Sequence, residues 1–214
     1  MLRTELFRLY LITDQKSLIN QDIMKFLSHV AESGVKMVQI REKHLPPSEL
    51  YNLTVQAVEL LRPAGVKVLI NDRADIALAA GADGIHITST GMPVDALRRI
   101  MPDNAIIGVS THTLEEAISA EKGGADFVTY GPIFFTQSKA KLGDPVGIER
   151  LKNVSSIVKI PIFALGGINI NNAADCLSAG AFGLAGIGVF QNSPDLSATV
   201  NNFVQILEKH ARCY

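Results

Sequence analysis

The sequence has no tryptophan, and its two cysteines, Cys176 and Cys213, lie far apart in a chain of 214 residues. Neither cysteine belongs to a CxxC pair or to a Cys and His spacing typical of zinc ligands. A disulfide scaffold, a zinc site and a dithiol redox pair therefore have no support in this chain.

A surplus of charge of either sign is also missing. Lys+Arg 20 against Asp+Glu 21 gives a formal net charge of -1, so little positive charge is available to neutralise nucleic acid or an anionic membrane. No apolar run reaches the roughly 18 residues of a membrane span, and Arg3, Glu5 and Arg8 interrupt the apolar start of the chain. We therefore expect a cytoplasmic protein without a signal peptide, a membrane span or a nucleic-acid partner.

Four segments of the chain resemble one another. In each, a Gly follows a helical pattern, where a left-handed C-cap favours Gly, and an apolar strand-like run begins within a few residues. The segments are SGVKMVQI (33–40), AGADGIHI (80–87), GGADFVTY (123–130) and AGAFGLAG (179–186), with the glycines Gly34, Gly81, Gly124 and Gly180. Four further strand-like runs alternate with them: RLYLITD (8–14), VKVLIND (66–72), AIIGVST (105–111) and IPIFALGG (160–167).

The eight runs are nearly continuous stretches of Val, Ile and Leu, as in parallel strands that helices cover. A helical pattern follows each run, and 47% of the residues are hydrophobic, which is enough for a substantial core. The sequence therefore predicts an α/β fold, a single-domain (β/α)8 TIM barrel over residues 1–214. An open doubly wound sheet is the alternative, which is disfavoured because no GxGxxG follows the first strand.

Barrel enzymes carry their chemistry at the carboxyl ends of the strands. Gln39, Arg41 and Lys43 alternate along one such end and therefore point to one side of the strand. Because unpaired buried cations are unfavourable, the two cations either pair with Asp14 and Asp72 or form an anion site.

A further cation, Lys139, lies in the hydroxyl-rich run FFTQSKAKLGDP. Together with Thr136 and Ser138 it could bind a diphosphate through charge and hydroxyl groups. The alternative is a mobile surface loop with an ordinary lysine.

Glycines follow the seventh strand (Gly166 and Gly167) and lie on the eighth (Gly186 and Gly188). Barrel enzymes commonly build a phosphate site there from backbone N–H groups. Glycines that are needed only for tight turns are the alternative explanation.

Two histidines lie at strand ends. His112 follows the fifth strand and has a side chain suited to proton transfer near neutral pH. It also neighbours a candidate capping box, Thr113 with Glu116, and both roles are compatible. His86 lies within a strand, where a packed core histidine is the favoured interpretation.

Six motifs, in this order, carry a resemblance to a known family: LYLITD, VQIREK, LINDRADIALAAGADGIHI, IGVSTHTLEEA, GADFVTYGPIFFTQSK and IPIFALGGI. The chain resembles the thiamin phosphate synthase/TenI family over nearly its whole length. The resemblance implies a (β/α)8 barrel, a homodimer and a small phosphorylated heterocyclic substrate in thiamin biosynthesis. Synthase members join hydroxymethylpyrimidine diphosphate to thiazole phosphate with Mg²⁺, whereas TenI members aromatise a carboxythiazole phosphate tautomer.

The resemblance also assigns roles to positions of this chain. It implies a diphosphate and pyrimidine shell, a backbone cradle for the thiazole phosphate, and one Mg²⁺ ligand. The shell is Gln39, Arg41, Lys43, Asn71, Ser110, Thr136, Ser138 and Lys139; the cradle is Gly167, Ile187 and Gly188; the Mg²⁺ ligand is Asp72.

One position departs from the synthase pattern. Synthases typically carry a stretch like HLGQEDMP, whose Asp is the second Mg²⁺ ligand, whereas this chain reads HITSTGMP, with Gly91 there. A single carboxylate is expected to weaken Mg²⁺ binding without abolishing it. TenI members also lack that Asp, and their catalytic His matches His112, although Gln39 is the synthase choice.

We therefore expect a TenI-type thiazole tautomerase that needs no cofactor and uses His112 as general acid and base. Thiamin phosphate synthase, with Mg²⁺ as cofactor, is the alternative. A non-catalytic regulator that binds a phosphorylated ligand is the third interpretation.

Overall fold

A computed structural model describes residues 8–18, 22–136 and 144–210, and its eight parallel strands close into a barrel in chain order. The strands are β1 Leu9–Ile12, β2 Met37–Ile40, β3 Lys67–Asn71, β4 Gly84–Thr88, β5 Ile106–Thr111, β6 Phe127–Tyr130, β7 Ile162–Leu165 and β8 Gly183–Gly186. β1 pairs with β2 on one side and with β8 on the other. This closure confirms the predicted (β/α)8 TIM barrel and contradicts the open doubly wound sheet.

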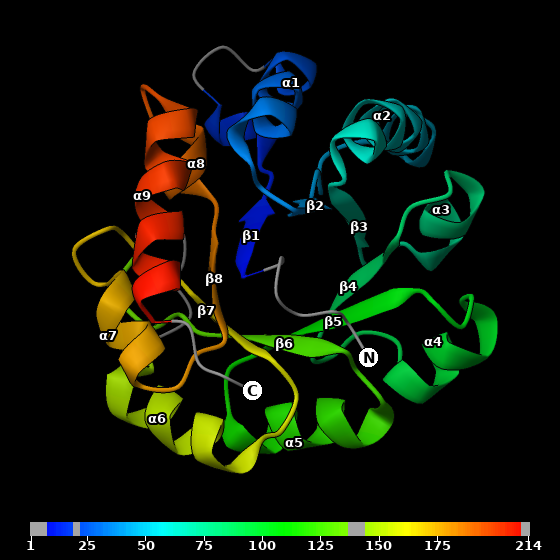
Figure 1. The fold of residues 1–214 in the computed structure, drawn as a ribbon. Coiled ribbons are helices and arrows are strands. Elements are labelled where there is room, and N and C mark those ends of the chain that lie inside the picture. The colour runs from blue at the N-terminus through cyan, green and yellow to red at the C-terminus, as the bar shows by residue number, and fades with distance from the viewer. Residues whose placement is uncertain (1–7, 19–21, 137–143, 211–214) are drawn as a thin grey trace.

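Helices form a ring outside the strands (Figure 1). They are α1 Ile23–Ser33, α2 Pro47–Leu61, α3 Ala74–Ala79, α4 Val94–Ile100, α5 Leu114–Gly123, α6 Gly147–Ile157, α7 Ala173–Ser178, α8 Gly188–Gln191 and α9 Leu196–Lys209. The sequence pattern did not predict α8, because a single turn is too short to show a helical period. Within the described ranges, no helix has both the length and the apolar character that crossing a bilayer requires.

The four repeat glycines lie at the predicted helix ends. Gly34, Gly81, Gly124 and Gly180 have φ angles of 90, 66, 91 and 104°, in the left-handed region that glycine adopts without a Cβ clash. The internal repeat is therefore a repeat of helix, glycine and strand, and each glycine directs the chain from the outer ring back to the barrel.

The protein has two apolar cores, one between the strands and the surrounding helices and one in the interior of the barrel, enclosed by the strands. Inside, aromatic rings meet edge to face: Tyr10 with Phe127 at 5.4 Å, Phe127 with Phe163 at 5.2 Å, and Phe163 with Phe182 at 5.6 Å between centroids. Phe127 begins β6 and Phe182 immediately precedes β8, so the rings fill the amino-terminal half of the barrel. The polar side chains of the strands lie closer to the carboxyl ends than these aromatic rings.

Candidate active site

A pocket opens at the carboxyl ends of the strands, where barrel enzymes place their chemistry. Every strand end contributes to its wall, so residues far apart in sequence meet there. The lining residues are Ile12, Gln39, Arg41, Lys43, Asn71, Thr88, Ser110, Thr111, His112, Thr129, Gly131, Pro132, Leu165, Gly166 and Ile187.

Arg41 and Lys43 form no ion pair with any described residue. Pairing with Asp14 and Asp72, the alternative that the sequence left open, is therefore absent from the described part of the chain. Arg41 is half-buried and Lys43 is exposed, and both line the pocket. Two cations without carboxylate partners favour an anionic ligand at this side of the pocket.

The backbone that carries these cations is held by Glu42, whose carboxylate is buried. Glu42 accepts hydrogen bonds from the Thr13 hydroxyl at 2.5 Å and from the Gln15 backbone N–H at 2.8 Å. The Arg41 backbone N–H donates to the same Thr13 hydroxyl oxygen at 3.0 Å. Burial raises the pKa of Glu42, although the hydrogen bond from Thr13 opposes that rise.

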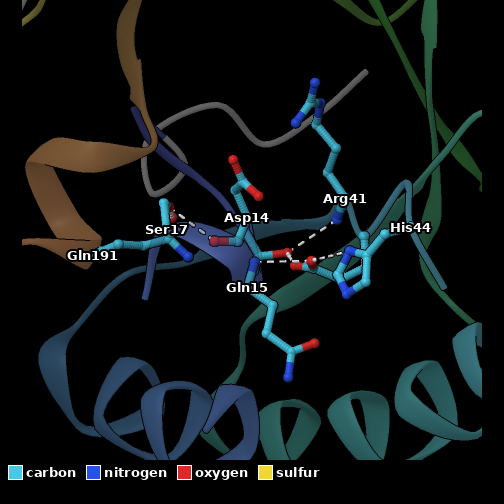
Figure 2. A network of polar contacts seen from close by, with 8 residues as sticks. Asp14, Gln15, Ser17, Arg41, His44 and Gln191 are labelled. Atoms are coloured by element: carbon cyan, nitrogen blue, oxygen red, sulfur yellow. Dashed lines mark hydrogen bonds and ion pairs between the residues drawn. The ribbon is translucent and has the colours of Figure 1, made fainter. Parts of the chain in front are cut away.

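The turn after β1 extends this network along one side of the barrel mouth, because β1 lies between β2 and β8. Figure 2 shows the network, with Arg41 at one side and Gln191 at the other. The Ser17 hydroxyl lies 2.7 Å from the Gln191 amide oxygen, to which it donates, and Gln191 is the last residue of α8. The turn therefore connects the cationic side of the pocket with the segment after β8.

His112 lines the pocket, and one of its two ring nitrogens forms a hydrogen bond with the backbone. Its Nδ1 lies 2.5 Å from the carbonyl oxygen of Gly131. A carbonyl oxygen only accepts hydrogen bonds, so Nδ1 carries a hydrogen, and in the neutral ring Nε2 has the free lone pair. This tautomer is suited to accepting a proton at Nε2.

The predicted capping box beside His112 is confirmed. The Thr113 hydroxyl accepts a hydrogen bond from the Glu116 N–H, and the Glu116 carboxylate accepts one from the Thr113 N–H. The His112 N–H also donates to Glu116, at 2.6 Å, and the Ser89 hydroxyl donates to the other carboxylate oxygen at 2.9 Å. Glu116 therefore holds His112 and the loop after β4 in one arrangement.

Asp72, the predicted Mg²⁺ ligand, is exposed beside the pocket with a left-handed φ of 56°. One carboxylate oxygen accepts from the Thr88 N–H at 3.2 Å and the other from the Asn71 side chain at 3.0 Å. The Gly91 N–H donates to the Thr88 carbonyl at 3.0 Å, so Gly91 lies in the same loop that orients Asp72. No group of three metal-ligating His, Cys, Asp or Glu side chains occurs in the part of the chain that the structure describes.

The glycines after β7 and β8 differ in what surrounds them. A Cβ at Gly167 would lie 2.7 Å from both the Phe134 Cβ and the Phe135 carbonyl oxygen, and φ is 66° there. A Cβ at Gly188 would meet only the Asn192 side-chain nitrogen, at 3.3 Å. Close packing against the loop after β6, together with the left-handed φ, is therefore sufficient to explain a glycine at Gly167.

The predicted site residues fall into three groups. Seven line the pocket: Gln39, Arg41, Lys43, Asn71, Ser110, His112 and Ile187. Thr136, Gly167, Gly188, Asp72 and Gly91 are described but lie outside the pocket lining. Ser138 and Lys139 lie outside the described residues.

Sequence reasoning missed several residues of the site. Thr88 and Thr129 line the pocket, and each ends or nearly ends a strand, which is the signal that could have found them. Glu42 was missed because it alternates with Arg41 and Lys43 and so points away from the pocket. Its burial depends on the loop after β1, which no local pattern reveals.

The fold and the pocket define the class of protein: a single-domain (β/α)8 barrel with a cationic site at the carboxyl ends of its strands. The chain belongs to the family described as thiamine monophosphate synthase (TMP-TENI), whose family model matches residues 9–190. The resemblance that the six sequence motifs indicated is confirmed, and the protein is a member of an enzyme family of thiamin biosynthesis.

Relatives match over nearly the whole chain. A thiamine-phosphate synthase of Methanospirillum hungatei is 39% identical over 199 residues, which cover 93% of this chain and 97% of the relative. A thiamine-phosphate synthase of Clostridium novyi is 36% identical over 200 residues, 94% of this chain and 98% of the relative. A solved thiamine phosphate pyrophosphorylase from Pyrococcus furiosus superimposes with a TM-score of 0.87 at 32% identity, covering 98% of this chain and 99% of that one.

Proposed function

We propose that the protein is a thiamin phosphate synthase, which joins hydroxymethylpyrimidine diphosphate to thiazole phosphate and releases diphosphate. One observation carries the proposal: relatives that match more than nine-tenths of both chains bear that name. The sequence favoured the tautomerase and kept the synthase as its alternative, and the names of the relatives favour the alternative.

In the proposed reaction, the bond between the pyrimidine methylene carbon and a diphosphate oxygen breaks, and the diphosphate takes the bonding electron pair. The thiazole nitrogen then donates its lone pair to the same carbon. Negative charge develops on the departing diphosphate, and Arg41 and Lys43, which have no carboxylate partner among the described residues, are the groups that would stabilise it. We assign Asn71 and Ser110, with Thr136, Ser138 and Lys139, to the same ligand shell, and Gly167, Ile187 and Gly188 to the thiazole phosphate.

The residues present fit a Mg²⁺ site with one carboxylate. Each oxygen of Asp72 accepts one hydrogen bond, and the side chain is exposed beside the pocket. Mg²⁺ is commonly held by one or two carboxylates together with substrate phosphates and water. Asp72 would hold the ion, which when bound supplies positive charge to the leaving diphosphate.

Two observations favour the thiazole tautomerase as a second candidate. The Nδ1 contact of His112 with Gly131 frees Nε2 to accept a proton, and moving a ring proton requires a positioned base. Gly91 also removes the carboxylate that the synthase pattern carries, a loss that would leave this proton transfer unaffected. In this reaction His112 would remove a proton from the thiazole ring and return one at another atom.

Two assays on the purified protein separate the candidates. The first supplies both phosphorylated substrates with Mg²⁺ and measures diphosphate and thiamin phosphate. The second supplies the carboxythiazole phosphate tautomer with a chelator and measures aromatisation, with His112→Ala as the variant. Product in the first assay supports the synthase. Aromatisation alone, lost in His112→Ala, contradicts the synthase and supports the tautomerase.

Failure of both assays would contradict both enzymes. If inorganic phosphate or diphosphate still binds the protein, the non-catalytic regulator becomes the supported interpretation. The homodimer stays a prediction, which sedimentation analysis of the purified chain tests.

A further inference from the structure

A chain of hydrogen bonds crosses the barrel interior beneath the pocket. The Gln39 amide nitrogen donates to the Tyr10 hydroxyl oxygen at 2.9 Å. The same hydroxyl lies 3.2 Å from His86 Nδ1, and His86 Nε2 lies 2.9 Å from the Ser110 hydroxyl oxygen. The first and last members, Gln39 and Ser110, both line the pocket, whereas Tyr10 and His86 lie below it.

The two middle members are shut off from solvent. Tyr10 is 0% and His86 is 1% exposed, so their polar atoms depend on one another for hydrogen bonds. Burial, with a smaller contribution from the charge of Arg41, lowers the pKa of His86 to about 3. The ring is therefore neutral near pH 7, and it has one donor nitrogen and one acceptor nitrogen.

Packing also fixes the position of the imidazole. Its centroid lies 5.6 Å from the rings of Tyr10 and of Phe127. On the neighbouring strand, a Cβ at Gly108 would lie 2.6 Å from His86 Nδ1, so the glycine leaves the space that the ring occupies. The ring has little freedom to turn, and its tautomer decides what it offers to each neighbour.

The Gln39 amide donor determines which way each hydrogen bond of this series is donated, from Gln39 through Tyr10 and His86 to Ser110. The buried Tyr10 hydroxyl contacts two described partners, and the Gln39 amide nitrogen can only donate to it, so the hydroxyl hydrogen goes to His86 Nδ1. Nδ1 is then the acceptor, so Nε2 carries the ring hydrogen and donates it to Ser110. The Ser110 oxygen accepts that hydrogen, and its own hydrogen remains available to the pocket.

We propose that His86 is a positioning residue that, through Tyr10, fixes the hydrogen-bonding sense of the pocket: Gln39 presents an oxygen acceptor and Ser110 presents a hydroxyl donor. The matching ligand has a group with an N–H or O–H facing Gln39 and an acceptor atom facing Ser110. This deepens the proposed function, because it states which polar groups of the pyrimidine substrate the site selects.

The direction of these hydrogen bonds is measurable by NMR on the full-length protein with ¹⁵N-labelled histidine, which shows which ring nitrogen carries the hydrogen. We expect His86, whose signals are assigned by their loss in His86→Gln, to be the neutral Nε2–H tautomer at neutral pH.

The informative variant is Gln39→Glu, which is nearly isosteric but whose carboxylate only accepts hydrogen bonds. Tyr10 must then donate to Glu, so His86 must donate from Nδ1, and we expect its signals to change to the Nδ1–H tautomer. Tyr51→Phe, on the outer surface of α2, is a control for tyrosine substitution and leaves the His86 signals unchanged.

Tyr10→Phe removes the connecting hydroxyl and keeps the ring. We expect His86 to lose its single tautomer, and the Kd for hydroxymethylpyrimidine diphosphate to rise about tenfold, the effect of one hydrogen bond. Two results would overturn the proposal even if Tyr10→Phe does not fold: a Nδ1–H tautomer of His86 in the unaltered protein, or a His86 that keeps the Nε2–H tautomer in Gln39→Glu. The NMR result does not depend on turnover. A protein that makes no thiamin phosphate but shows the expected tautomers would contradict the proposed function, whereas the role of His86 in fixing the hydrogen-bond direction would stand.

Discussion

Glu42 accepts a 2.5 Å hydrogen bond from the hydroxyl of Thr13 across the ends of two neighbouring strands. The same hydroxyl oxygen accepts the backbone N–H of Arg41, so one buried carboxylate holds both the loop after β1 and a cation of the pocket. This arrangement explains why an acidic residue lies between two cations, Arg41 and Lys43, that line the pocket. Glu42 orients their backbone from the opposite face.

Glu42→Gln is expected to lower the free energy of unfolding and to weaken anion binding. The amide NH₂ group has to face either the partly buried Gln15 N–H or the buried Thr13 hydroxyl, so one of these two donors loses the carboxylate acceptor, which costs about 1–3 kcal/mol. Urea unfolding measures the loss, and diphosphate titration measures the binding. Glu59→Gln makes the same chemical change on the exposed face of α2; equal effects of the two substitutions would contradict the bracing role of Glu42.

Gly91→Asp is expected to improve Mg²⁺-dependent formation of thiamin phosphate. A Cβ at Gly91 would lie 3.1 Å from the Thr88 carbonyl oxygen, so a side chain fits with a small adjustment. The new carboxylate would join Asp72 in the same loop arrangement and lower the Mg²⁺ concentration for half-maximal rate by about tenfold. Gly91→Asn is the neutral control of equal size; an equal response to Asn and Asp would show that charge at this position is irrelevant.

Gly167→Ala is expected to destabilise the protein more than Gly188→Ala does. At Gly167 the left-handed φ of 66° and the 2.7 Å approach to Phe134 both oppose a Cβ, which together cost about 2 kcal/mol or more. At Gly188 the Cβ would meet only the end of the Asn192 side chain at 3.3 Å. Urea unfolding compares the two variants, and equal midpoints would refute the packing explanation of Gly167.

His86 is expected to make the protein acid-sensitive. Its pKa is about 3 in the folded state against 6.5 for an ordinary histidine, so between these values the unfolded chain binds the additional proton. The free energy of unfolding therefore falls as the pH falls from 6.5 towards 3, by up to about 1.4 kcal/mol per pH unit. His86→Gln lacks this group, so the stability difference between unaltered protein and variant shrinks on acidification. Parallel stability curves from urea unfolding would contradict the burial of a neutral imidazole.

Local patterns in the sequence were enough to predict the barrel. Gly34, Gly81, Gly124 and Gly180 mark the returns from helix to strand, and the apolar runs after them lack the alternation of half-exposed strands. The short helix α8 escaped prediction because a single turn has no measurable period.

Part of the site was predictable for the same reason. Alternation places Gln39, Arg41 and Lys43 on one side of a strand, and the barrel places strand ends together, so all three were expected at one pocket. His112 was expected there because it follows a strand directly. The resemblance to the family added Asn71, Ser110 and Ile187, which also line the pocket.

The sequence by itself determined that Gln39, Arg41 and Lys43 share one face and where the eight strands lie along the chain. Only the tertiary structure decided which side chains meet: Tyr10 reaches His86 across 76 positions of sequence, and Thr13 reaches Glu42 across 29. It also showed that Gly167 is needed where the loop after β6 crosses it. The physical reason is that the periodicity of side-chain direction is set by the local backbone. The hydrogen-bond partner of a side chain depends instead on strand register and on closure of the barrel, which bring together residues that no local pattern relates.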